Sequence, residues 1–140
     1  MEIQIRYGSR TGNTKKIADA MAEAAGIKAL PASEPLTGRV DLLFIGSGIY
    51  AGQVDPSVMT LVDSLEKGWV GLVALFSTAA GNTSAETKLR RVLTDKGIQV
   101  ASSAFHCKGK FLLANRNRPN EEDLQAAAAF AVMQVRGLSG

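Results

Sequence analysis

The sequence predicts an α/β fold in which a doubly wound parallel sheet of five strands, in the order 2-1-3-4-5, is covered by helices on both faces. The first observation behind this prediction is that apolar runs of strand length alternate along the chain with segments of helical period. The second is that the intervening segments have the length of crossover connections between parallel strands. The third is length, because a chain of 140 residues forms one domain (1–140) that buries about two-thirds of its surface.

Five apolar runs are expected as the strands, because each is short and bounded by turn residues or polar residues. They are Glu2–Tyr7, Ile27–Leu30, Asp41–Gly46, Val70–Phe76 and Ile98–Phe105.

Four helices are expected between and after these strands, and their ends carry recognisable signals. The second begins with Asp55 as cap and Pro56 at its first position, and the third begins with the capping-box pattern Thr83-Ser84-Ala85-Glu86. The last follows Pro119 and has three acidic residues in its first turn. The expected ranges are Asn13–Ala25, Asp55–Lys67, Thr83 to the stop at Gly97, and Asn120–Arg136.

Composition excludes several classes of protein. Cys107 is the only cysteine, so the chain forms no internal disulfide and no cysteine-rich metal cluster, and a reducing, cytoplasmic setting fits best. Residues 1–4 lack the basic and apolar regions of a secretory signal. The longest uncharged run, Gly68–Ala85, is interrupted by polar residues and glycine, so we expect no membrane span.

The net charge of +3 comes from the second half of the chain. Between residues 96 and 120 there are basic residues and no acidic ones, which gives either a solvated basic loop or a docking surface for an acidic partner or an anionic ligand. No aromatic residues are interleaved as in a nucleic-acid interface, so nucleic acid is not expected as a partner. The basic residues are Lys96, Lys108, Lys110, Arg116 and Arg118.

The first loop, Gly8–Thr14, joins the first strand to the first helix and is rich in hydroxyl groups. Parallel sheets of this order bind ligands at the carboxyl ends of their strands, where this loop lies. Its hydroxyls and the amides of the helix start can donate to a phosphate, and Gly12 allows a close backbone approach. An ordinary polar turn with a helix cap is the alternative. The Walker and dinucleotide-binding patterns are both absent from it.

The segment Ser9-Arg10-Thr11-Gly12-Asn13-Thr14 resembles the phosphate loop of flavodoxins, S/T-x-T-G-N-T, at the same place between the first strand and first helix. The resemblance implies a flavodoxin-like fold and a bound flavin mononucleotide (FMN). It also implies which residues surround the FMN phosphate, with Arg10 at the variable position. The residues carried over are Ser9, Thr11, Gly12, Asn13 and Thr14.

The second loop, Ser47–Gln53, is uncharged and follows an apolar strand. In flavodoxins the equivalent loop flanks the isoalloxazine ring of FMN. The resemblance therefore implies that Tyr50 stacks on the ring and that a peptide at Gly52 can turn toward the flavin N5. A packing role for Tyr50 and a plain turn at Gly52 are the alternatives. The candidate binding residues are Ser47, Gly48, Ile49, Tyr50, Ala51 and Gly52.

The third loop, Ser77–Asn82, offers small residues and backbone donors that suit the pyrimidine edge of a flavin. It departs from long-known flavodoxins because it lacks an aromatic residue, which leaves the second ring-flanking group unassigned. The candidates are Ser77, Thr78, Ala79, Ala80, Gly81 and Asn82. The sole tryptophan, Trp69, lies at the far end of the fourth strand and is expected to pack in the structure.

After the last strand, Cys107-Lys108-Gly109-Lys110 resembles a C-x-G-K segment of some flavodoxin-like proteins. His106 and Cys107 are expected to be structural, on opposite faces of the sheet. The three loops contain no Asp or Glu, which argues against a phosphoacceptor receiver domain and against paired-carboxylate catalysis.

The function expected from these features is electron transfer between redox partner proteins through one bound FMN. The alternative is a flavodoxin-like oxidoreductase acting on a quinone or similar small substrate, as menaquinone-dependent protoporphyrinogen oxidases do. A third possibility is an interaction module of the same fold without FMN.

Overall fold

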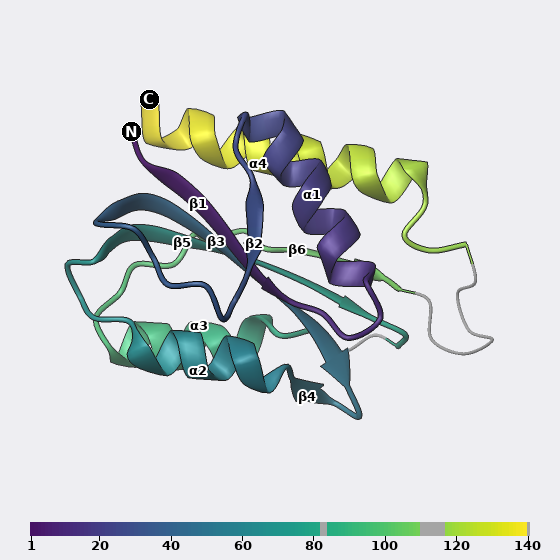
Figure 1. The fold of residues 1–140 in the computed structure, drawn as a ribbon, viewed down its shortest axis with the longest axis horizontal. Helices are drawn as coiled ribbons and strands as arrows, with labels where there is room; N and C mark the ends of the chain where they lie inside the picture. Colours follow the sequence, from purple (N-terminus) through teal and green to yellow (C-terminus); the bar gives the residue numbers. More distant parts are fainter. Residues whose placement is uncertain (82–83, 110–116, 140) are drawn as a thin grey trace.

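The computed structural model of the chain describes residues 1–81, 84–109 and 117–139. It confirms the predicted α/β fold: five parallel strands form a twisted sheet in the order β2-β1-β3-β5-β6, which corresponds to the predicted 2-1-3-4-5 (Figure 1). A sixth strand, β4, pairs antiparallel with the end of β3. The strands are β1 Ile3–Gly8, β2 Ala29–Pro31, β3 Val40–Tyr50, β4 Gln53–Val54, β5 Val70–Ala79 and β6 Phe105–Lys108.

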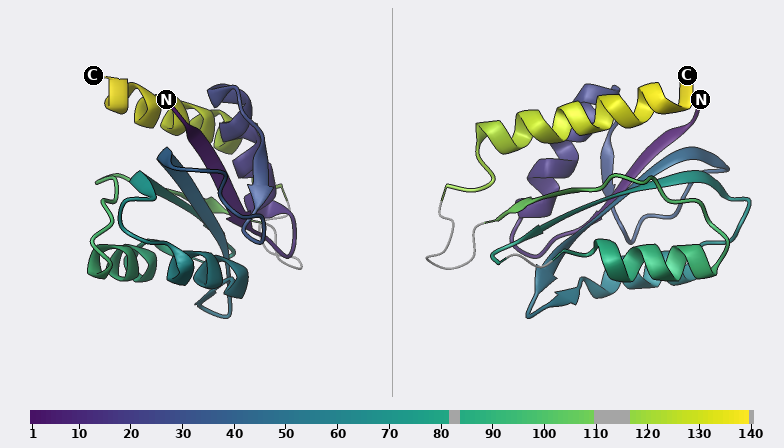
Figure 2. Two further views of the ribbon diagram at one scale, coloured as in Figure 1. Left: turned by 60° about the vertical axis from the view of Figure 1, so that its left-hand side comes forward. Right: turned by 180° about the vertical axis from the view of Figure 1, so that it is seen from behind.

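Helices cover both faces of the sheet. The helices α1 (Asn13–Ala25) and α4 (Glu121–Ser139) lie on one face, and α2 (Pro56–Ser64) and α3 (Glu86–Asp95) lie on the other (Figures 1 and 2). Each pair closes over its own apolar cluster, one around Ile17, Phe44 and Phe76 and the other around Ile45, Val58 and Leu89.

None of the helices within the described residues is both long enough and apolar enough to span a membrane.

The strands β3 and β5 extend further toward their carboxyl ends than the sequence indicates. Their register continues through Ser47 with Ser77 and Gly48 with Thr78, so these residues belong to the sheet and not to loops. The glycines in β3 explain the error. A side chain at Gly46 would lie 2.0 Å from the Phe76 ring, so this glycine makes room for an aromatic neighbour and does not mark a turn.

The last strand begins later than predicted. Residues 98–101 pair with β5 only around Val73, which bonds to Gln99 and Ala101. The polar, exposed Ser102 and Ser103 then interrupt the pairing, and β6 starts at Phe105. His106 and Cys107 therefore lie inside the strand, whereas the sequence placed them after it.

The starts of three of the four helices agree with the predicted signals. The bounds of α1 are those predicted, Asp55 caps α2 by accepting the backbone N–H of Ser57 at 2.9 Å, and Asn120 caps α4. The third helix instead begins at Glu86, after Ala85 at the cap position, so Glu86 is its first residue and its carboxylate pairs with Arg90 at 2.7 Å. Thr83, the first residue of the predicted capping box, lies outside the described residues. The third helix ends as predicted, because Gly97 takes a left-handed φ of +79° directly after the cap residue Lys96. The second helix ends earlier than predicted, at Ser64, and the last continues beyond Arg136 to Ser139.

Candidate functional site

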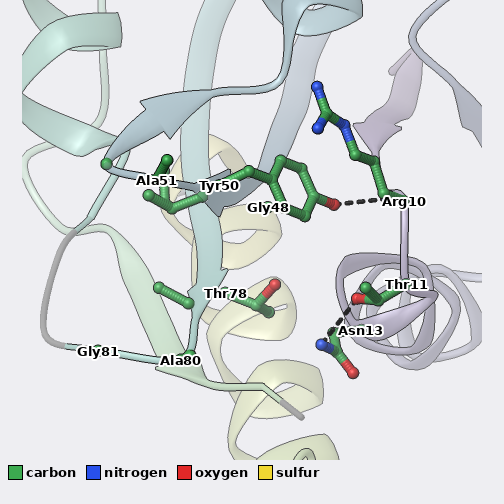
Figure 3. A pocket seen from close by; sticks show the side chains of 12 residues that line it. Arg10, Thr11, Asn13, Gly48, Tyr50, Ala51, Thr78, Ala80 and Gly81 are labelled. Carbon is green, nitrogen blue, oxygen red and sulfur yellow. Dashed lines mark hydrogen bonds between the residues drawn. The ribbon is translucent and has the colours of Figure 1, made fainter. Parts of the chain in front are cut away.

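A pocket of about 420 Å³ opens at the carboxyl ends of β3 and β5 (Figure 3). Its walls come from the three segments singled out in the sequence, which the sheet order brings together. No other described segment contributes to the lining. The lining residues are Arg10, Thr11, Asn13, Gly48, Ile49, Tyr50, Ala51, Gly52, Thr78, Ala79, Ala80 and Gly81.

The first loop leads into the start of α1 through a left-handed Gly12, whose φ is +88° and which has open space on its side-chain side. Ser9 Oγ accepts the backbone N–H of Gly12 at 3.0 Å, and Asn13 Nδ2 donates to Thr11 Oγ1 at 2.9 Å. The backbone N–H groups of the first turn of α1 add partial positive charge at this point. Hydroxyls, an amide and a helix start together make an anion-binding loop.

Thr14 lies beneath this loop and does not line the pocket. Its side chain is fully buried, and its hydroxyl is 2.8 Å from that of Thr78 on β5. This hydrogen bond ties the start of α1 to the sheet. Sequence reasoning placed Thr14 with the phosphate contacts, whereas the structure directs its hydroxyl to β5.

The second loop is a β-hairpin. Strand β3 runs through Tyr50, a two-residue turn at Ala51 and Gly52 has φ of +52° and +77°, and Gln53 pairs back with Tyr50. Ser47 is buried below this hairpin, where its hydroxyl accepts the backbone N–H of Asp55 at 2.9 Å. Ser47 therefore fixes the hairpin to the start of α2 instead of lining the pocket.

Tyr50 forms one wall of the pocket and contacts the first loop. Its hydroxyl accepts the backbone N–H of Arg10, and the Arg10 guanidinium lies 4.6 Å from the centre of the Tyr50 ring. The ring folds back over Gly48, where a side chain would come within 2.5 Å of the Tyr50 hydroxyl. In Figure 3 the guanidinium lies on one side of the ring and Ala80 and Gly81 on the other.

The third segment contributes Thr78–Gly81 to the pocket, and Asn82 lies outside the described residues. Ser77 is buried behind the pocket wall. Its hydroxyl is 3.0 Å from His106 Nδ1 and 3.3 Å from the backbone nitrogen of Ala85, so it connects β5 to β6 and to the start of α3.

His106 and Cys107 on β6 have environments that oppose ionisation. Burial, followed by the charge of Lys108, lowers the pKa of His106, and its Nε2 has no hydrogen-bond partner among the described residues. Burial raises the pKa of Cys107 to about 12. A buried thiol with this pKa is a poor nucleophile at neutral pH.

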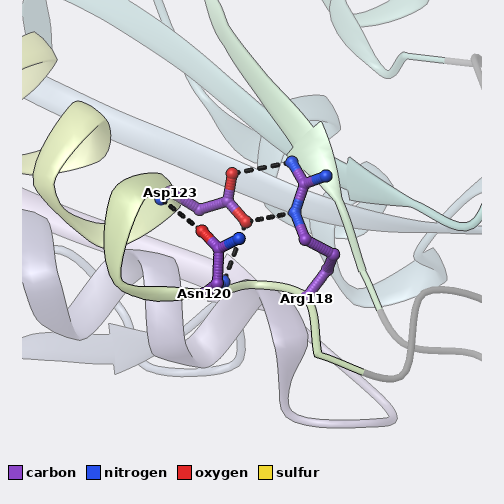
Figure 4. Close-up of polar contacts among 3 residues, drawn as sticks. All are labelled: Arg118, Asn120 and Asp123. Atoms are coloured by element: carbon purple, nitrogen blue, oxygen red, sulfur yellow. Dashed lines mark hydrogen bonds and ion pairs between the residues drawn. The ribbon is translucent and has the colours of Figure 1, made fainter.

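The three described basic residues between residues 96 and 120 lie at separate places in the structure. Arg118 makes a two-pronged ion pair with Asp123, whose backbone N–H and carboxylate also bond to Asn120 (Figure 4). Lys96 donates to the carbonyl of Asp63 near the amino ends of the strands. Lys108 ends β6 beside the pocket residue Ala79. The remaining two, Lys110 and Arg116, lie outside the described residues.

Two further sequence expectations concern the rest of the molecule. Trp69 is 45% exposed and lines a second pocket at the opposite end of the sheet, so the prediction that it packs is wrong. Across the described part of the chain, no three His, Cys, Asp or Glu side chains gather as a metal site.

The fold and the site define an α/β protein that binds a ligand carrying a phosphate and a flat, uncharged portion. Residues 4–118 match the model of the flavodoxin domain family, and the chain belongs to that family. It is 32% identical over 132 residues to an uncharacterized protein of Methanocaldococcus jannaschii, a match that covers 85% of this chain and 87% of that protein.

Two solved structures share the whole fold. One is a flavodoxin from the domain Archaea, with a TM-score of 0.80, 17% identity and full coverage of both chains. The other is flavodoxin 1 of Bacillus cereus, with a TM-score of 0.76, 16% identity and coverage of 97% of this chain and 98% of that one. Membership of the flavodoxin family makes this chain an FMN-binding protein.

The residues at the pocket fit FMN. A phosphate dianion matches the hydroxyls and N–H groups around Thr11 and Asn13, and none of the described lining residues is acidic. A flat ring matches the uncharged wall that runs from Gly48 to Gly52. FMN contains both a phosphate and a flat ring, and the residues that match them lie in one pocket.

Proposed function

We propose that this chain carries electrons between redox proteins through one FMN held in the pocket described above. The observation that carries the proposal is the pairing, in a single pocket, of an anion-binding loop with a wall of small and apolar residues. When bound, FMN supplies one-electron chemistry, because its ring accepts and releases electrons singly.

The first loop would hold the phosphate. Thr11 and Asn13 face the pocket and can donate from a hydroxyl and an amide, while the amides at the start of α1 face the same point. Ser9 holds the loop's shape through Gly12. This assignment gives Thr14 a supporting role through Thr78 instead of a direct contact.

The hairpin and the third segment would hold the ring. Tyr50 presents an aromatic face, and Gly52 leaves the peptide beside it free of a side chain. On the other side Thr78, Ala79 and Ala80 offer small groups that allow a ring to lie close to the backbone. The second aromatic neighbour common in this family has no counterpart among the described lining residues.

A carrier is favoured over a self-contained enzyme by the chemistry of the lining. The described pocket walls include no Asp, Glu, His, Lys or Cys that could move protons to or from a substrate. The hydroxyls of these described walls belong to Thr11, Tyr50 and Thr78, and that of Tyr50 is already bonded to the Arg10 amide. Outer-sphere electron transfer needs no such group.

Titration of the apoprotein with FMN, riboflavin and FAD tests cofactor choice. We expect FMN to bind tightest, because the first loop provides a site for one terminal phosphate, which riboflavin lacks and FAD carries only within a diphosphate. Riboflavin binding as tightly as FMN would contradict the assignment of the first loop.

Stopped-flow mixing of the FMN-loaded protein with NAD(P)H tests the reaction class. A carrier is expected to be reduced rapidly only when a reductase is added. Rapid reduction by NAD(P)H alone, followed by reoxidation by a quinone, would favour the oxidoreductase alternative.

A further inference from the structure

Gly109, the residue that follows β6, lies against the first loop. The backbone N–H of Gly109 donates to the carbonyl of Ala79 at 3.0 Å, which continues the pairing of β6 with β5 by one residue. Gly109 is buried, and Ala79 lines the pocket. The glycine of the Cys107–Lys110 motif is therefore placed at the pocket by the sheet itself.

Glycine is required at position 109 because there is no space for a side chain, and not because of the backbone conformation. Its φ lies outside the left-handed region, so any residue could adopt it. A Cβ at this position, however, would lie 2.7 Å from Asn13 Nδ2, 3.0 Å from Asn13 Cγ and 3.1 Å from Asn13 Cβ. The Asn13 side chain thus occupies the space that a side chain at residue 109 would need.

The contact between Gly109 and Asn13 also affects Thr11, because Asn13 is hydrogen-bonded to it. Its Nδ2, the atom nearest to the Gly109 position, donates to Thr11 Oγ1 at 2.9 Å, and both residues line the pocket. A methyl group at residue 109 would displace this amide from the position in which it bonds to Thr11. The orientation of two phosphate-binding candidates therefore depends on residue 109, which is far from them in sequence.

We infer that Gly109 is a positioning residue of the phosphate site, and that the glycine of the Cys107–Lys110 motif serves to seat Asn13 against Thr11. The inference rests on the proposed function of the first loop. Gly109, directly after β6, would then take part in cofactor binding without the help of a charged side chain.

The test compares Gly109→Ala with Gly71→Ala. The second is a matched control, because a Cβ at Gly71 would lie 2.8 Å from the Asp41 carbonyl, without a left-handed φ, at the amino end of β5. We expect Gly109→Ala to weaken FMN about tenfold, as expected for one lost hydrogen bond to a charged group, and to leave riboflavin affinity unchanged. Gly71→Ala should change neither affinity.

A double-mutant cycle with Asn13→Ala shows whether Gly109→Ala weakens FMN binding through Asn13. Because Asn13→Ala removes the two nearest atoms, adding Gly109→Ala to it should cost little further FMN affinity. If Gly109→Ala folds poorly, the double variant should recover stability. Equal loss of FMN and riboflavin, a full further loss in the Asn13→Ala background, or no recovery would overturn the inference.

A readout without flavin separates this inference from the proposed function. In the apoprotein, the side-chain amide resonances of Asn13 should shift in Gly109→Ala and stay in place in Gly71→Ala. If wild-type protein bound FMN no better than riboflavin, the proposed function would fail, while the amide shift would still report whether Gly109 positions Asn13. An unshifted amide would overturn the inference alone.

Discussion

Two threonines in the first loop have opposite environments. Thr11 lines the pocket with its hydroxyl at the surface, whereas Thr14 is buried and bonded to Thr78. We expect Thr11→Ala to weaken FMN by about 1.5–3 kcal/mol, the usual value of a hydrogen bond to a charged group, with little change in the free energy of unfolding. Titration with FMN and urea unfolding of the apoprotein measure the two quantities.

The matched control is Thr14→Val, which keeps the shape of the side chain. It should lower the free energy of unfolding by about 1–3 kcal/mol, because the Thr78 hydroxyl loses a buried partner. The flavin preference should persist in the folded protein. A Thr14→Val protein of normal stability that no longer prefers FMN over riboflavin would return Thr14 to the phosphate contacts.

His106 makes stability depend on pH near neutrality. Burial lowers its pKa below 6.5, so the unfolded chain binds a proton more readily than the folded protein. The free energy of unfolding should therefore fall as the pH drops through about 6.5 and level off below the folded pKa. Urea unfolding between pH 7.5 and 5.5 measures this slope. His106 is the only histidine in the chain, which makes the assignment direct.

His106→Gln is expected to flatten that slope whatever its effect on absolute stability. The carboxyl groups of Asp41 and Asp123 have lowered pKa values and titrate in more acidic solution, outside this window. An unchanged slope in His106→Gln would assign the pH dependence to other groups.

At the scale of elements, the order and type of the strands and helices could be predicted from apolar periodicity, and the ends of β3 and β5 could not. Gly46 and Gly48 resemble turn residues in sequence, yet they are strand residues that accommodate Phe76 and Tyr50. Whether a glycine ends a strand or makes room for a ring depends on residues far away in the chain. Such contacts leave no local pattern.

For the pocket, too, local sequence patterns predict one part, and contacts between residues distant in the chain determine the other. All its described lining residues belong to segments that the sequence singled out, because strand ends and loop chemistry are local features. Their roles depend on packing: Ser47, Ser77 and Thr14 face inward to partners on other elements. The contact of Gly109 with Asn13 depends on the pairing of β6 with β5 and was not predictable.

The turn between β3 and β4 carries strain that one substitution can relieve. Ala51 has a φ of +52°, which costs an L-residue with a Cβ about 1–2 kcal/mol, and the following Gly52 has a φ of +77°. The sequence Asn-Gly is preferred in two-residue hairpin turns of this kind. We expect Ala51→Asn to raise the free energy of unfolding by about 0.5–1 kcal/mol, measured in urea.

The reverse change at the neighbouring position serves as the control. Gly52→Ala should destabilise the protein by about 1 kcal/mol, because it adds a second Cβ in the left-handed region. If Ala51→Asn gave no gain while Gly52→Ala gave the expected loss, the strain at Ala51 would be compensated by its contacts in the pocket wall.

At the scale of the whole molecule, the net charge of +3 says less about the pocket than the position of each charge does. Arg118 is neutralised by Asp123, and Lys96 lies at the far end of the sheet. Arg10 stands at the pocket rim, stacked on Tyr50, and takes part in no ion pair among the described residues. Among the described residues, Arg10 is the cation that lines the pocket and Lys108 is paired with the lining residue Ala79, so the electrostatic effect on a bound flavin should come first from these two.

Arg10→Gln is expected to lower the potential for full reduction of the flavin, because fully reduced flavin is anionic and a nearby cation stabilises it. One unit charge about 10 Å away is worth roughly 0.4–1.7 kcal/mol for effective dielectrics of 80 to 20, or roughly 20–70 mV for one electron. The shift should shrink at high salt. Potentiometric titration at two ionic strengths measures it.

Arg39→Gln is the control for this charge change, since Arg39 pairs with Asp41 and lines the second pocket at the other end of the sheet. It should leave the potential within a few millivolts, as expected for a screened charge beyond the Debye length. Equal shifts from both variants would show that net charge, and not the position of Arg10, sets the potential.

The inertness of Cys107 has a practical consequence for experiments on this protein. A thiol with a pKa of about 12 is ionised in only about one molecule in 10⁵ at pH 7, and burial also bars reagents from reaching it. Wild-type protein therefore already serves as a background for site-specific labelling. A cysteine introduced at the exposed Met133 on α4 would take up a maleimide probe alone, and mass spectrometry should find a single adduct. The same protection should keep Cys107 reduced when a flavin reoxidises in air and releases peroxide.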